Sequence, residues 1–363
     1  MSQEARTTRT LGRFERLPTR RIVLVALSIG IATAVAYGSY RTLTLPAGQR
    51  YSGSAWRDFL VLGVAQGAVY ALIALGYTLV YGILRMINFA HGEVFMAGAF
   101  GSFFFADAWE RSGFLDRRPV LAVLLLVLLA MAVSVTVAVL LERIAYRPLR
   151  GAPRLVPLIT AIGASLFLQN TFRGLFGAQT RGYPKPTALE GTWSILGIPV
   201  QRVQVLVLVV AAAAMVVLTQ FVSRTKTGKS MRAAAEDQEI AALMGIDVDR
   251  VIVTTFVLGG MLAGIAGVLF ALTFGNISYF MGFAPGITAF TAAVLGGIGS
   301  ISGAAIGGLV IGVLQSIGPA LLLTGIHVPS PFQLKDVVTF LILILVLLFR
   351  PGGILGTGEV EKV

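Results

Sequence analysis

Long, almost uncharged apolar segments recur along this chain, and they limit what it can fold into. Several approach or exceed the roughly 20 apolar residues that cross a bilayer as a helix. Because the runs are continuous rather than alternating, they exclude a β-barrel. We predict an all-α polytopic membrane protein with about 8–10 transmembrane helices, eight if residues 286–325 form a re-entrant segment. The apolar segments lie at about 22–40, 59–83, 93–109, 119–141, 155–176, 201–222, 251–275, 286–300, 303–325 and 337–349.

Composition supports this class. Of the 363 residues, 56% are hydrophobic and 13% are charged, and the mean hydropathy is +0.84. Ordinary globular domains are about a quarter charged, so this chain lacks the residues that would cover a water-facing surface. The chain has no cysteine, and its two histidines, His91 and His327, are far apart. We therefore expect no disulfide and no metal site.

The basic residues predict an orientation. With the segments laid alternately from an inside N-terminus, inside segments hold 18 of the 29 Lys and Arg residues. This bias places both termini in the cytoplasm and explains the net charge of +12 without a nucleic-acid partner. It divides the chain into a basic cytoplasmic tail (1–21), a transmembrane domain (22–350) and a cytoplasmic C-terminal tail (351–363). The arginine pair before the first apolar run resembles a signal peptide, but we expect an uncleaved anchor.

A polar cluster interrupts the apolar stretch 76–101. It consists of Arg85, Asn88, His91 and Glu93. If 84–95 is helical, Glu93 lies two turns above Arg85, about 12 Å along the axis, which is too far for a direct ion pair. Ionisable groups in a bilayer are costly and usually face a cavity, a pathway or a partner. Two interpretations stay open: a role in a transport pathway or its gating, and an interfacial turn whose charges reach lipid headgroups.

The inside loop 223–250 is the most informative polar segment. From Ser230 to Met244 it is rich in good helix formers, and Gly245 stands where a helix would stop. We predict a short surface helix with a narrow face of small side chains that docks on another protein. A plain connector would not need 28 residues. The residues of that face are Met231, Ala234, Ala235, Ala241 and Ala242.

Two further features concern the packing of the helices against one another and the outside loop. Glycines spaced four apart, such as Gly260 and Gly264 or Gly308 and Gly312, predict close approach of helix backbones. The outside loop 177–200 is turn-rich. It is either a simple lid-like connection or a landing surface for an external partner.

No enzyme motif withstands inspection. Thr227-Gly228-Lys229-Ser230 has the end of a phosphate loop, but the first glycine would have to be at position 223, which is Ser223. Nothing else in the sequence forms a catalytic constellation. We expect a chain that is not an enzyme and binds no cofactor itself.

Four segments together resemble one family. The segment 76–100, with INFAHGE at Ile87–Glu93, resembles the signature of LivH-type permeases of branched-chain amino acid ABC importers. The inside loop 228–245 resembles the coupling loop of the same family, and 255–269 and 290–308 resemble its late helices. The resemblance covers about residues 59–350, in order.

The resemblance implies a bacterial inner-membrane permease subunit for branched-chain or other apolar amino acids. It implies a second, LivM-type permease, two cytoplasmic ATPases that bind the ATP, an external substrate-binding protein and surrounding membrane lipid as partners. The inside loop 223–250, from here on the coupling loop, would dock on an ATPase. Its main positions by this resemblance and the loop composition are Met231, Ala235, Asp237, Ala241, Met244 and Gly245.

Other transport classes stay open. A related permease for urea, amides or sugars would share the architecture. An ion-coupled secondary transporter is a further alternative, although such proteins often show paired half-chain repeats, and no clear repeat is visible here. Dependence on ATP without a nucleotide site in this chain would separate the permeases from the secondary transporter.

Overall fold

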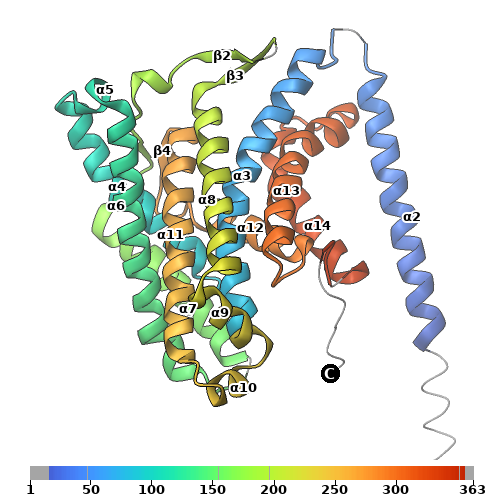
Figure 1. Cartoon of the computed structure of the whole chain (residues 1–363). Coiled ribbons are helices and arrows are strands. Elements are labelled where there is room, and N and C mark those ends of the chain that lie inside the picture. Colours follow the sequence, from blue (N-terminus) through green and yellow to red (C-terminus); the bar gives the residue numbers. More distant parts are fainter. Residues whose placement is uncertain (1–15, 47, 154, 196, 351, 356–363) are drawn as a thin grey trace, which may run out of the picture.

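The structure, a computed structural model, describes residues 16–46, 48–153, 155–195, 197–350 and 352–355 (Figure 1). Within these residues the chain is a helical bundle, which confirms the predicted class. The four strands form two short antiparallel pairs, β1 with β4 and β2 with β3. The elements are α2 (Arg16–Leu43), α3 (Gly53–Leu84), α4 (His91–Arg111), α5 (Phe114–Arg117), α6 (Pro119–Leu140), a π-helix (Leu141–Tyr146), α7 (Leu155–Phe176), β1 (Arg181–Gly182), β2 (Thr192–Ile195), β3 (Ile198–Gln201), α8 (Arg202–Arg224), α9 (Lys226–Glu236), α10 (Gln238–Leu243), α11 (Val248–Phe274), β4 (Asn276–Ile277), α12 (Phe283–Gly296), α13 (Ile301–Leu323) and α14 (Lys335–Phe349).

Every predicted apolar segment overlaps one of these helices. In the described part of the chain, seven helices are long and apolar enough to cross a membrane: α3, α6, α7, α8, α11, α13 and α14, some with short continuations. Two more are also long, α2 with 28 residues and α4 with 21. Helix α12 has only 14 residues. At 1.5 Å per residue it extends about 21 Å, short of the roughly 30 Å hydrocarbon core.

The ends of the chain differ from the predicted tails. Helix α2 begins at Arg16, so residues 16–21 of the predicted N-terminal tail are helical, and residues 1–15 lie outside the described part. In the predicted C-terminal tail, residues 352–355 return to α12. The amides of Ile354 and Leu355 donate hydrogen bonds to the carbonyls of Leu295 (2.7 Å) and Gly296 (3.0 Å). Residues 356–363 lie outside the described part.

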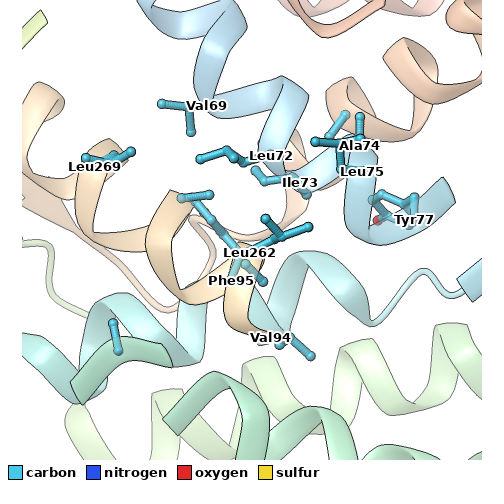
Figure 2. Close-up of a cluster of buried hydrophobic side chains, with 14 of the residues drawn as sticks. Val69, Leu72, Ile73, Ala74, Leu75, Tyr77, Val94, Phe95, Leu262 and Leu269 are labelled. Carbon is cyan, nitrogen blue, oxygen red and sulfur yellow. The ribbon is translucent and has the colours of Figure 1, made fainter. Parts of the chain in front are cut away.

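Helix α3 is the centre of the bundle (Figure 1). Every residue from Ala65 to Val80 is buried, because α8, α11, α12 and α13 surround the helix. A helix that is apolar all round is typical of such a buried position or of a membrane span. Figure 2 shows the resulting cluster, in which Leu72 and Ile73 of α3 lie near Phe95 of α4 and Leu262 of α11.

Glycines bring the buried helices into backbone contact, as their spacing predicts. A Cβ atom on Gly308 or Gly312 of α13 would overlap backbone atoms of Ala71 or Gly67 of α3. A Cβ on Gly264 of α11 would lie 2.7 Å from the backbone of α6. In a membrane, close packing of this kind holds helices together where no hydrophobic force does.

The two ends of α8 carry the two long loops. The β2–β3 hairpin precedes α8 and the helices α9 and α10 follow it, so they lie at opposite ends of the molecule (Figure 1). Helix α8 has 23 residues, about 35 Å in length.

At the hairpin end, Asp116 of α5 accepts hydrogen bonds from the amide (2.8 Å) and the hydroxyl (2.9 Å) of Thr187. The hydrogen bond from the Thr187 amide, followed by that from its hydroxyl, holds the pKa of the exposed Asp116 carboxyl below its usual range.

Candidate functional site

The predicted helix over 84–95 is interrupted. Helix α3 ends at Leu84, and Arg85 takes a left-handed conformation with φ of 53°. Residues 85–90 are not helical, and α4 begins at His91. The helix considered over 84–95 does not form, because Arg85 takes a left-handed conformation that more often belongs to glycine.

The interrupted segment folds back into the protein. The His91 ring lies so close to Gly76 that a Cβ atom there would overlap it, and it packs edge-on against Tyr77 with ring centroids 4.9 Å apart. Gly76 lies eight residues before the end of α3, about 12 Å along the axis. Irregular backbone at this depth is tolerated only where protein buries it, as it does here. This geometry contradicts a simple interfacial turn.

The four predicted pathway residues have different environments. Arg85 is exposed, whereas Asn88, His91 and Glu93 are at most 2% exposed. The Asn88 side-chain oxygen accepts a hydrogen bond of 2.6 Å from the Tyr146 hydroxyl in the π-helix. The cluster is therefore not one site. Asn88 and His91 are held by packing and hydrogen bonding inside the bundle, and Glu93 faces elsewhere.

Glu93 lies at a cavity. Its Oε1 atom accepts hydrogen bonds from Ser165 Oγ (3.1 Å) and Gln169 Nε2 (2.7 Å), both on α7. In the described part of the chain, no group donates a hydrogen bond to its Oε2 atom. The adjoining cavity has a volume of about 250 Å³ and lies between α3, α4, α7 and α12.

Sequence reasoning found part of this site. Five polar residues lie in or beside apolar spans and could line one cavity by sequence alone: Gln66, Gln169, Asn170, Asn276 and Gln315. Of these, Gln169 contacts Glu93. Ser165 was missed, although its spacing of four from Gln169 on an apolar helix is a usable signal. The other four residues of that set do not line the cavity: Gln66, Asn170, Asn276 and Gln315.

The coupling loop is two helices rather than one. Helix α9 ends at Glu236, and Asp237 is extended with φ of −153°. The Asp237 carboxylate then accepts a hydrogen bond of 2.9 Å from the Ile240 amide and caps α10. Composition favoured a continuous helix, but an aspartate cap is a strong local start signal that divides it. Gly245 has φ of 84°, the left-handed position expected after the last turn.

The small-residue face points inward. Met231, Ala234 and Ala241 are at most 3% exposed, because α9 and α10 pack against α3, α8 and α11 of the same chain. This corrects the prediction for these three side chains, which contact their own chain rather than another protein, whereas Ala235 is half-buried and Ala242 is exposed. The exposed apolar residues of the loop are Ile240 (60%), Leu243 (87%) and Met244 (78%), which form an apolar tip.

Two hydrogen bonds join the coupling loop to the end of α3 and the first residue of the segment 85–90. The Arg85 guanidinium donates to the Ala235 carbonyl (2.9 Å), and Gln238 Nε2 donates to the Ile83 carbonyl (2.5 Å). We call this pair the Arg85–Gln238 latch. It connects two regions that are about 150 residues apart in the sequence.

An ionic cluster joins the loop to α6. Asp249, in the first turn of α11, pairs with Arg147 (2.7 Å) and Arg150, and Arg150 also pairs with the fully buried Glu142 of the π-helix. Breaking a buried pair leaves an uncompensated charge, so this cluster fixes the end of α11 against α6.

Comparisons with known proteins match this chain to one family of permeases. The family described as branched-chain amino acid transport system / permease component matches residues 59–347. The permease protein BraD of Pseudomonas aeruginosa, of a high-affinity branched-chain amino acid transport system, is 47% identical over 84% of this chain and 97% of its own length. LivH of Escherichia coli is 45% identical over 83% of this chain and 96% of its own length.

More distant matches are shorter or weaker. The fructose import permease protein FrcC of Rhizobium meliloti is 33% identical over 26% of this chain and 28% of its own length. Among solved structures, PsaBC from Streptococcus pneumoniae in complex with Fab covers 82% of this chain and 91% of its own chain, with 16% identity and a TM-score of 0.39.

Proposed function

This chain belongs to the branched-chain amino acid transport permease family, and on that premise we propose that it is the LivH-type membrane subunit of an ATP-driven importer of branched-chain or other apolar amino acids. The observation that carries the proposal is the match at 47% identity over nearly the whole length of BraD. The fructose permease matches only a quarter of this chain, which favours the amino-acid reading over the sugar alternative. The relatives are permease subunits of ABC importers in bacterial inner membranes, not enzymes.

The nucleotide is assigned to partner subunits. The sequence Gly228-Lys229-Ser230 lies inside helix α9, and a Cβ atom on Gly228 would overlap the Val222 carbonyl. A phosphate loop needs a free glycine-rich backbone ahead of a helix, not one packed within it. Two cytoplasmic ATPases bind ATP in this proposal, and each coupling loop docks through its apolar tip.

The remaining partners follow from the two ends and the sides of the bundle. The β2–β3 hairpin lies opposite the coupling loop and exposes Trp193 by 50%, so it is the contact for an external substrate-binding protein. Helices α7 and α14 leave most of their apolar side chains exposed. Membrane lipid and a second, LivM-type permease cover them.

Uptake measurements test the function. Cells lacking this chain, and the same cells complemented with it, are compared for uptake of labelled leucine, urea and ribose. We expect leucine uptake to fall and to return on complementation, and to stop when ATP is depleted. Loss of urea or ribose uptake alone would mean that this solute, and not an amino acid, is the substrate. Uptake driven by an ion gradient without ATP would indicate a secondary transporter.

The Arg85–Gln238 latch gives a prediction about coupling. Gln238→Ala and Arg85→Ala each remove one hydrogen bond between the loop and the end of α3. A hydrogen bond contributes about 0.5–1.5 kcal/mol, so we expect uptake to fall about three- to tenfold. ATP hydrolysis by the assembled transporter should fall less than uptake, because the loop would still dock.

Arg143→Ala is the matched control, since Arg143 is an exposed arginine of the π-helix. It should leave both rates unchanged. If the two latch variants lower ATP hydrolysis and uptake equally, the latch serves docking rather than transmission, and the prediction is wrong.

A further inference from the structure

The Glu93 carboxylate has one atom without a function in the fold. Its Oε1 atom accepts both hydrogen bonds from α7, and Oε2 receives none from the described residues. The side chain is 1% exposed. Burying a carboxylate oxygen without a donor costs several kcal/mol, so native proteins rarely retain one without a reason.

Oε2 is buried against the opposing backbone of α12, and the Glu93 side chain borders the cavity. A Cβ atom on Gly282 would lie 2.7 Å from Oε2, so only a glycine lets α12 approach this buried oxygen so closely. Gly286, one turn further on, also lines the cavity. The cavity opens instead at the surface of the bundle, where its lining residues Ile162, Leu166 and Phe283 are exposed.

The walls of the cavity are mostly apolar. Aliphatic and aromatic side chains from α7 and α12 surround the carboxylate, and no basic side chain of the described chain reaches the cavity. A volume of about 250 Å³ lies just below the range of about 300–1,000 Å³ that is typical of sites for drug-sized ligands. It suits a small molecule with one cationic end and an aliphatic body. The lining residues used here are Ile162, Leu166, Phe283 and Ile287.

We propose that the Glu93 cavity binds a small aliphatic amino acid in the membrane domain, with the substrate ammonium paired with the Glu93 carboxylate. The aliphatic side chain lies against Ile162, Leu166 and Ile287. Ser165 and Gln169 position the carboxylate by holding Oε1. This inference rests on the proposed function and adds a substrate site within the permease itself.

Glu93→Gln is the decisive variant. A glutamine keeps an oxygen that accepts from Ser165 and Gln169, but it places an N–H donor where the ammonium would bind. The transporter assembled with its partner subunits is reconstituted in lipid nanodiscs without the external binding protein. Binding of labelled leucine is measured, with competition by isoamylamine, which lacks the carboxylate, and isocaproate, which lacks the amine.

We expect leucine to bind and isoamylamine to compete with it far better than isocaproate. In Glu93→Gln, leucine binding should weaken about ten- to a hundredfold, because a hydrogen bond to a charged group is lost. Asp107→Asn on the same helix is the matched control, since among the described residues Asp107 forms only a surface ion pair with Arg111, and it should bind as the wild type does.

Three results would overturn the proposal: no leucine binding to the wild-type complex, equal competition by both analogues, or unchanged binding in Glu93→Gln. A Glu93→Gln subunit that no longer assembles with the second permease would assign the carboxylate to an ion pair with that partner instead. Each of these leaves the proposed function standing if the wild-type transporter imports leucine with its binding protein. Failure of that import would remove the proposed function.

Discussion

Replacing Leu243 with aspartate is expected to abolish uptake while the protein still accumulates in the membrane. Leu243 is 87% exposed, so it contributes little to the fold, and it forms the apolar tip with Ile240 and Met244. Burying a leucine in a partner's cleft contributes about 1.5–3 kcal/mol. A charge there adds a desolvation cost, so docking should weaken at least about a hundredfold.

The measurements are leucine uptake, the amount of protein in membranes and co-purification of the ATPases. Leu355→Asp is the control, because Leu355 is another exposed apolar residue (45%) but lies outside the coupling loop. It should leave all three unchanged. Normal co-purification of the ATPases with Leu243→Asp would mean that the apolar tip is not the docking surface.

A different outcome is expected for Ala241→Arg in the same loop. Ala241 is 3% exposed and faces the bundle. An arginine there should lower the amount of folded protein, because its charge would be buried without a partner. Leu243 and Ala241 lie in the same six-residue helix, α10. Comparing the two variants therefore separates a loss of docking from a loss of folding.

Replacing Gly312 with leucine is expected to prevent accumulation of folded protein. A side chain on Gly312 would overlap backbone atoms of Gly67 and Gly63 in α3, the central helix. Forcing extra volume into a packed core costs about 1–3 kcal/mol or more. Backbone atoms cannot move aside as side chains do, so the two helices would have to separate. We expect the membrane level to fall at least about tenfold.

Gly30→Leu is the control for that prediction. Gly30 of α2 is also a glycine inside a long helix, but a Cβ atom there meets nothing within 4 Å. Membrane level and thermal stability of both variants are compared by quantitative immunoblotting and by heating in detergent. If Gly312→Leu accumulates and transports like the wild type, backbone contact between α3 and α13 is not essential.

Much of the architecture follows from local sequence properties. The ten apolar segments predicted about 8–10 transmembrane helices, and each segment overlaps a helix, since length and apolarity mark a segment that can cross a bilayer. Gly308 and Gly312 predicted a close helix contact, because their spacing places both on one face. Gly245 predicted the end of the coupling helix for the same local reason, its tolerance of positive φ.

The candidate site was predicted only in part. Residues Arg85, Asn88, His91 and Glu93 were singled out because charge in an apolar run is costly, and that argument needs no fold. Their division into an exposed latch, buried packing groups and a cavity carboxylate could not be predicted. It depends on Tyr146, Ser165 and Gln169, which come from distant elements.

The sequence by itself determined the class, the helix positions and the family, because these depend on composition and on short motifs. Only the tertiary structure decided that 85–90 folds back into the bundle and that the coupling loop divides at Asp237. The tertiary structure also decided that the Ala241 side chain faces the bundle and the Leu243 side chain faces outward. A helix period says which residues share a face, but which face meets the rest of the chain depends on the neighbours that assemble around it.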